Sequence, residues 1–158
     1  MKATTPTLHL ICGLPGSGKT TLAAKLEKEL GALRLSPDDW MMRTVGHLHN
    51  EQARVAIELI QWEIAQKVLA SGMDVILEFG FWSRGERDEY RRAARKLGAK
   101  TQLYYLDVPI EKLKRRMRNR NAGIHDAGLY IDPAKLDDWA NSFEKPVADE
   151  FGSAYMYS

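Results

Sequence analysis

The chain has 158 residues, of which 44% are hydrophobic and 28% are charged, and its formal net charge is +2 at pH 7. Such a length fits a single domain, expected over residues 1–158, which can bury a core without a disulfide or a structural metal. The near-neutral charge gives no argument for a nucleic-acid partner, and the single cysteine excludes an intramolecular disulfide framework.

Residues 1–7 contain one lysine and no apolar run of their own, so they do not resemble a signal peptide. No stretch of the chain approaches the roughly 18 apolar residues that a membrane-spanning helix needs. A single cysteine, Cys12, within an apolar run suits a reducing compartment. We therefore expect a cytoplasmic protein with no membrane partner.

The first predicted element is a strand at residues 8–12, a short apolar run typical of a strand buried on both faces of a parallel sheet. It leads into a glycine-rich turn and then into a helix on which Leu22, Leu26 and Leu30 repeat every four residues. The turn matches the pattern G-x-x-x-x-G-K-[ST], in the strand–turn–helix context that this motif requires. With one neighbour, its residues are Gly13, Leu14, Pro15, Gly16, Ser17, Gly18, Lys19, Thr20 and Thr21.

Phosphate chemistry explains the residues of this turn. Its glycines let backbone N–H groups converge on phosphate oxygens, and the following helix adds the positive end of its dipole. Lys19 can reach the β and γ phosphates, and the Thr20 hydroxyl is a natural ligand for Mg²⁺. The alternative is a glycine-rich turn with an incidental lysine. We favour a site for a nucleoside triphosphate and Mg²⁺.

The second predicted strand, residues 33–35, leads into Ser36-Pro37-Asp38-Asp39-Trp40. These residues form a helix-start signal, with serine as N-cap, proline at the first helical position and carboxylates in the first turn. A functional interpretation competes, because the carboxyl ends of parallel strands face one crevice, where Asp38 would lie across from Lys19. A carboxylate there can accept the proton of a substrate hydroxyl that attacks the γ-phosphate. We favour Asp38 as the catalytic base, with Asp39 supporting it at the substrate site.

A second helix ends before Gly72, and its apolar residues follow the helical period: Ala53, Ala56, Ile57, Ile60 and Ile64. The third predicted strand, residues 73–77, ends in Glu78. A carboxylate at this place typically holds Mg²⁺ through water or contacts the acceptor, although an apolar run followed by an acid is common. We assign Glu78 to both the metal site and the substrate site.

Aromatic and basic residues follow Glu78. Phe79, Phe81 and Trp82 can line an acceptor pocket, although packing is their more frequent role, and we assign Trp82 to the substrate site. Arg84 and Arg87 come next, and whether they contact an anionic acceptor is left open. A helix before Gly98, with Tyr90, Ala93, Ala94 and Leu97 in register, then precedes a fourth strand at residues 102–106.

The last third of the chain is predicted as a helix over 109–120, a loop over 121–132, a helix over 133–143 and a short strand within 154–157. On the first of these helices, Lys112, Arg116 and Arg120 form one stripe. A charge run is usually a solvated face, and it can also be a nucleic-acid patch. Placed over the phosphate turn, the stripe can stabilise the transferring phosphoryl group, so we assign Arg116 and Arg120 as catalytic.

Strands that alternate with helices in this way imply right-handed crossovers and a three-layer α/β sandwich with a parallel sheet and helices on both faces. With these residues assembled, the chain resembles the P-loop kinase group that includes predicted bacterial ATP-binding kinases, chloramphenicol phosphotransferase, zeta toxins and the 5′-kinase domain of polynucleotide kinase. The resemblance runs from about residue 8 to residue 150.

The resemblance implies a P-loop NTPase fold with about five parallel strands, ATP and Mg²⁺ as cofactors, Asp38 as base and lid arginines at 116 and 120. The segment around 116–132 then looks like a lid that closes to exclude water. In polynucleotide kinase an arginine lies three residues after the base. Here that position is Met41, with Arg43 two residues on, which we include among the substrate residues.

Three functions compete. The first is an ATP- and Mg²⁺-dependent phosphotransferase that acts on a hydroxyl of a small-molecule partner. The second is a polynucleotide 5′-hydroxyl kinase, which the basic helix favours and the near-neutral charge and Met41 oppose. The third is a nucleotide-dependent binding module in which hydrolysis only switches a loop.

Overall fold

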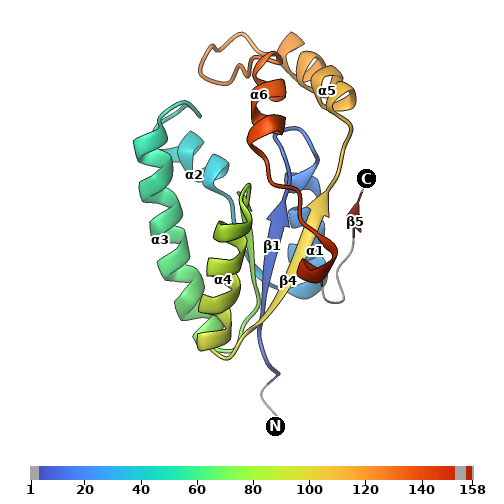
Figure 1. The fold of residues 1–158 in the computed structure, drawn as a ribbon. Helices are drawn as coiled ribbons and strands as arrows, with labels where there is room; N and C mark the ends of the chain where they lie inside the picture. Colours follow the sequence, from blue (N-terminus) through green and yellow to red (C-terminus); the bar gives the residue numbers. More distant parts are fainter. Residues whose placement is uncertain (1–3, 152–155, 158) are drawn as a thin grey trace.

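The computed structural model describes residues 4–151 and 156–157, and its centre is a parallel β-sheet (Figure 1). The body of the sheet consists of β1 (Thr7–Cys12), β2 (Leu33–Leu35), β3 (Val75–Gly80) and β4 (Lys100–Leu106). A two-residue strand, β5 (Met156–Tyr157), pairs with β4, and the order across the sheet is β2-β3-β1-β4-β5. The predicted parallel α/β sheet is confirmed, with four strands in its body rather than five. Residues 154 and 155 of the predicted last strand lie outside the described residues.

The central strand, β1, is buried along all but its first residue. β1 pairs with β3 on one side and with β4 on the other, so that Leu8 lies opposite both Val75 and Thr101. Leu8, Leu10 and Ile11 of this strand have no exposed surface. His9, a polar residue in the middle of this strand, is also buried, and its Nδ1 is hydrogen-bonded to the Tyr104 hydroxyl at 3.0 Å, as burial of a polar side chain requires.

Helices cover the two faces, which gives the three predicted layers. α3 (Glu51–Ala70) and α4 (Arg84–Lys96) pack on one face, where Ala65, Leu69 and Ala94 join the core formed by Leu8 and Leu10. α1 (Lys19–Leu30) packs on the other face and contributes Leu22, Ala23 and Leu26 to a cluster with Ile11 and Ile76. Figure 1 shows α3 and α4 together on one side of β1 and β4.

The buried face of α3 differs from the predicted one. Ile57, Gln61, Ala65 and Leu69 point into the protein, whereas Ile60 is 49% exposed. The prediction counted only apolar residues, but the helix also buries the polar Gln61. Its side-chain amide can be buried because it donates a hydrogen bond of 3.0 Å to the Ser36 carbonyl. This contact ties α3 to the start of the short helix α2 (Pro37–Thr44).

Four further segments complete the fold: α2 (Pro37–Thr44), α5 (Ile110–Ala122), α6 (Lys135–Ser142) and the 3₁₀ turn η1 (Ala148–Glu150). The predicted helix start at Ser36 is confirmed, since its hydroxyl accepts a hydrogen bond of 3.4 Å from the Asp39 N–H. α5 continues to Ala122, past the predicted end at residue 120. In Figure 1, α2, α5 and α6 gather at the end of the sheet toward which β1 and β4 point. This is the end where the phosphate turn lies.

A buried ion pair ties the end of the described chain to the back of the site. Arg87 donates to the Glu150 carboxylate at 2.7 Å and to the Phe81 carbonyl at 2.8 Å, and both charged side chains are 0% exposed. The Cys12 thiol, also buried, donates to the same carbonyl at 3.4 Å. These contacts hold Phe81 at φ 51°, a left-handed conformation that a bulky side chain rarely adopts.

Within the residues that the structure describes, no helix is long and apolar enough to span a bilayer.

Candidate active site

The turn after β1 has the backbone shape that phosphate binding needs. Gly16 and Gly18 have φ values of 80° and 100°, in the left-handed region where a side chain would be strained, and Gly18 is the N-cap of α1. The Lys19 ammonium donates to the carbonyls of Gly13 and Leu14 at 3.0 Å each, so it lies folded over the turn. Burial lowers the pKa of Lys19 to about 8, against the opposing effects of Asp38 and Glu78. The ammonium is therefore desolvated, which favours its interaction with a negatively charged phosphate.

Thr20, at the start of α1, lies beside Glu78 of β3. The Thr20 hydroxyl donates to Glu78 Oε1 at 2.9 Å, and Arg34 Nε donates to Oε2 of the same carboxylate at 2.6 Å. The side chain of Glu78 is 4% exposed, and burial raises its pKa, opposed by the hydrogen bond from Arg34. Hydroxyl and carboxylate oxygens are the donors that Mg²⁺ prefers, so this pair fits the predicted metal site.

Asp38 faces the phosphate turn from the first turn of α2. Its side chain is 58% exposed and forms an ion pair with Nη2 of Arg54, which reaches it from α3. Nη1 of Arg54 lies 3.7 Å from Glu58 Oε1, one helical turn further along α3. Burial raises the pKa of Glu58 to about 7, although Arg54 opposes this shift.

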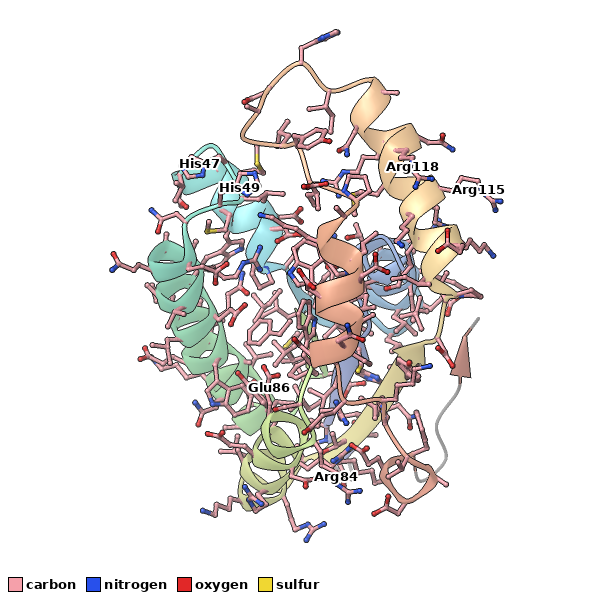
Figure 2. All side chains as sticks on the ribbon, turned by 45° about the horizontal axis from the view of Figure 1, so that its top comes forward. His47, His49, Arg84, Glu86, Arg115 and Arg118 are labelled. Carbon is pink, nitrogen blue, oxygen red and sulfur yellow. The ribbon has the colours of Figure 1, made fainter. Side chains whose placement is uncertain are left out.

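The two predicted lid arginines have different positions. Arg116 Nη1 donates to the Gly16 carbonyl at 3.1 Å, so α5 rests on the phosphate turn. Arg120, one turn later, lines the cavity described below. Figure 2 shows Arg115 and Arg118 on α5, where both side chains are exposed. The basic helix is thus divided between a solvated face and a face on the phosphate turn.

The loop from Gly123 to Ala134 closes one side of the site. The Asn121 amide donates to the Ile131 carbonyl at 2.7 Å, which draws the two ends of the loop together. Its Gly128 carbonyl accepts a hydrogen bond of 3.2 Å from the Leu48 N–H, in the segment that also holds His47 and His49 (Figure 2). The predicted lid therefore spans from α5 to the segment after α2.

These elements enclose a cavity of about 1230 Å³, large enough for a nucleotide and a small second substrate. Of the predicted site residues, those that line it are Pro15, Gly16, Gly18, Lys19, Thr20, Asp38, Glu78, Trp82 and Arg120. Phe79, Trp139, Glu58 and Glu86 form further parts of its wall. The structure thus places Lys19, Asp38 and Glu78 around one space.

Some predicted residues lie elsewhere. Asp39 turns away from the cavity to Arg34, at 3.3 Å, and among the described residues Arg43 is not part of the cavity wall. Neither Arg84 nor Arg87, for which the sequence leaves an acceptor contact open, is part of the cavity wall: Arg84 pairs with Asp149, and Arg87 is buried on Glu150. Figure 2 shows Arg84 directed toward the C-terminal segment, whereas Glu86 is on the side of α3.

Among the residues of the site that sequence reasoning missed are three charged side chains that contact predicted ones: Arg34, Arg54 and Glu58. Arg34 stands in the middle of β2, and Arg54 and Glu58 are two of several charges on α3. One signal was present, since a charged residue inside a short strand of a parallel sheet needs a buried partner. Nothing in the pattern of α3 distinguishes Arg54 from its exposed neighbours.

Comparison with known proteins gives a family and a set of relatives. A family model described as an AAA domain, AAA_33, matches residues 8–146. UMP-CMP kinase 1 of Oryza sativa subsp. japonica is 31% identical over 144 residues, which are 83% of this chain and 58% of the relative. The chain spans about 58% to 61% of the length of the curated relatives that it matches.

Solved structures also share the fold, and two of them cover nearly the whole chain. A crystal structure from Chloroflexus aurantiacus j-10-fl superimposes with a TM-score of 0.78 at 23% identity, over 98% of this chain and 88% of the other. Chaetomium thermophilum Kti12, in complex with ADP-AlF3, gives a TM-score of 0.75 at 19% identity, over 96% and 88%. At these identities the likeness shows the fold alone, and the predicted fold class is confirmed.

Proposed function

The chain belongs to the AAA domain family AAA_33, as its resemblance to P-loop kinases predicts, and we propose that it is an ATP- and Mg²⁺-dependent phosphotransferase with a small-molecule hydroxyl as acceptor. The observation that carries the proposal is the shared cavity of Lys19 and Asp38. A phosphate-binding cation and a carboxylate that line the same space are the two parts that transfer to a hydroxyl requires.

The donor side binds the triphosphate through the phosphate turn. Backbone N–H groups of the turn and the N-terminus of α1 surround the phosphates, and Lys19 moves from the Gly13 and Leu14 carbonyls onto them. Thr20 and Glu78 would hold Mg²⁺, which neutralises charge on the β and γ phosphates when it is bound. Arg120, which lines the cavity, and Arg116, which contacts the Gly16 carbonyl, would bind the transferring group.

The acceptor side uses Asp38. The acceptor hydroxyl gives its proton to the Asp38 carboxylate as its oxygen bonds to the γ-phosphorus, and the bond from that phosphorus to the β–γ bridging oxygen breaks to release ADP. Trp82, Phe79 and Trp139 supply apolar wall for the body of the acceptor.

The charge of the cavity supports a small molecule over a polynucleotide. Its wall holds seven carboxylates against four lysines and arginines: Asp38, Glu51, Glu58, Glu78, Glu86, Asp132 and Asp138 face Lys19, Arg54, Arg120 and Lys135. A polyanionic strand would need an excess of positive charge along its path. The 5′-kinase alternative therefore has the basic face of α5 in its favour and the acceptor wall against it.

The test is transfer from γ-labelled ATP into a panel of amino alcohols, aminoglycosides, nucleosides, sugars and 5′-hydroxyl oligonucleotides, with Mg²⁺ and with EDTA. We expect one acceptor class to be labelled, Lys19→Ala to lose ATP binding and transfer, and Asp38→Asn to lose transfer while it still binds ATP. Arg92→Gln, an exposed change on α4, is the matched control.

Two outcomes would redirect the proposal. Labelled oligonucleotides with a steep salt dependence would favour the polynucleotide kinase. ATP turnover that survives in Asp38→Asn, with no acceptor labelled by any variant, would favour the nucleotide-dependent binding module, in which hydrolysis only moves the loop that contacts Leu48.

A further inference from the structure

Asp38 is poorly fixed by its own helix. It lies in the first turn of the eight-residue helix α2, and its side chain is 58% exposed. An exposed aspartate can rotate among several side-chain conformations. A base must lie within hydrogen-bond reach of the proton that it accepts, so a second group has to select one conformation.

An opposite charge lies across the cavity and would select the wrong conformation. Lys19 and Asp38 line the same space, and the negative charge of Asp38 is the largest electrostatic effect that stabilises the charged form of Lys19. Attraction between unit charges is strong in a partly desolvated site. If Asp38 turned onto Lys19, the phosphate would lose its cation and the acceptor its base.

Arg54 provides the competing contact. Its Nη2 binds Oδ1 of Asp38, and in the described part of the chain Oδ2 accepts no hydrogen bond. One carboxylate oxygen is therefore occupied and the other is available to an acceptor hydroxyl.

The guanidinium is itself held in place. Besides its contact with Asp38, its Nη1 lies 3.7 Å from Glu58 Oε1, one helical turn later on α3. Arg54 is 26% exposed, so little of its length is free to move in solvent. The ion pair with Asp38 alone already compensates the charge of the guanidinium, so no surplus charge is left to bind an anionic substrate and positioning remains as its role.

We infer that Arg54 is a positioning residue for the proposed base: it orients Asp38 toward the acceptor hydroxyl and keeps its carboxylate away from Lys19. This inference rests on the proposed phosphotransferase function. If the Arg54–Asp38 pair had a purely structural role, removal of Arg54 would change stability little and kcat not at all, because exposed ion pairs contribute little to stability.

The experiment compares the intact chain with Arg54→Gln, Arg54→Lys and the control Arg92→Gln, in the transfer assay with the best acceptor. We expect Arg54→Gln to lower kcat about 100-fold, the effect of a misplaced catalytic group. The Kd for ATP should change less than about twofold, and the unfolding midpoint by no more than a few degrees. Arg54→Lys, which keeps a positive charge within reach of Asp38, should recover most of the loss in kcat. Arg92→Gln should match the unmodified chain.

Each result decides between the inference and its premise. Full kcat in Arg54→Gln, or a loss that is the same in Arg54→Lys, overturns the inference while the phosphotransferase stands. A loss of ATP affinity as large as the loss of kcat also overturns it, because the residue would then serve the donor site. An unmodified chain that labels no acceptor overturns both the proposed function and the role of Arg54.

Discussion

Arg34 should contribute strongly to stability, because it is the cation that pairs with the buried Glu78. Its Nε donates to Glu78 at 2.6 Å, and the two side chains are 16% and 4% exposed. In Arg34→Gln the Glu78 carboxylate stays buried without its cation. Removal of one partner from a buried ion pair costs about 3–5 kcal/mol, and the remaining hydrogen bond from Thr20 places the expected loss near the lower end, about 3 kcal/mol.

The loss should depend on pH in a defined direction. Burial already raises the pKa of Glu78, and Arg34 is the main group that opposes this rise, so the pKa of Glu78 should be higher still in Arg34→Gln. A carboxyl group whose pKa is raised on folding binds its proton more tightly in the native state than in the unfolded state. The folded protein therefore loses stability as the pH rises. The difference between Arg34→Gln and the unmodified chain should therefore be largest near pH 8 and smaller near pH 5.

Urea unfolding at both pH values measures the effect. A double variant, Arg34→Gln with Glu78→Gln, is the matched control, since a neutral partner no longer needs a cation. It should be more stable than Arg34→Gln alone at pH 8. A loss below about 1 kcal/mol in Arg34→Gln, or losses that simply add in the double variant, would refute the reasoning.

Two further predictions concern charges outside the phosphate turn. Arg87→Met should cost about 3–5 kcal/mol in urea unfolding, because it leaves the fully buried Glu150 without its main partner; a change below about 1 kcal/mol would mean that Arg91 alone satisfies Glu150. Glu58, whose pKa burial raises to about 7, holds a proton in the folded state that the unfolded chain releases between about pH 4.5 and 7, so it lowers stability as the pH rises through that window. Glu58→Gln should remove this dependence and gain up to about 2–3 kcal/mol over the unmodified chain between pH 5 and pH 8. Parallel stability curves for the two proteins would contradict it.

The parts of the site predicted from sequence are those that follow directly from strand ends. The phosphate turn directly follows β1, Asp38 lies three residues after the end of β2, and Glu78 lies in the last part of β3, not after it as predicted; such strand ends share one edge of a parallel sheet by topology. Local sequence was therefore enough to bring Lys19, Asp38 and Glu78 together, and the cavity contains all three.

Residues that depend on side-chain reach could not be predicted in this way. Arg54 meets Asp38 only because α3 runs back past α2, and that packing is set by a buried Gln61 that no apolar period reveals. Arg87 follows the aromatic residues in sequence, but on α4 its side chain points inward and donates a hydrogen bond to the Phe81 carbonyl. Asp39 looks equivalent to Asp38 in the sequence, but the helical rotation of one residue directs it to Arg34.

The buried thiol of Cys12 makes the chain well suited to a spectroscopic study of its own lid. Burial raises the pKa of Cys12 to about 12, and the reactive thiolate is therefore almost absent at neutral pH. A maleimide dye added under native conditions should leave this cysteine untouched and react only with one introduced at an exposed position such as Ala127. Fluorescence from that single dye would then follow the loop as nucleotide is added, with no cysteine removed from the core beforehand.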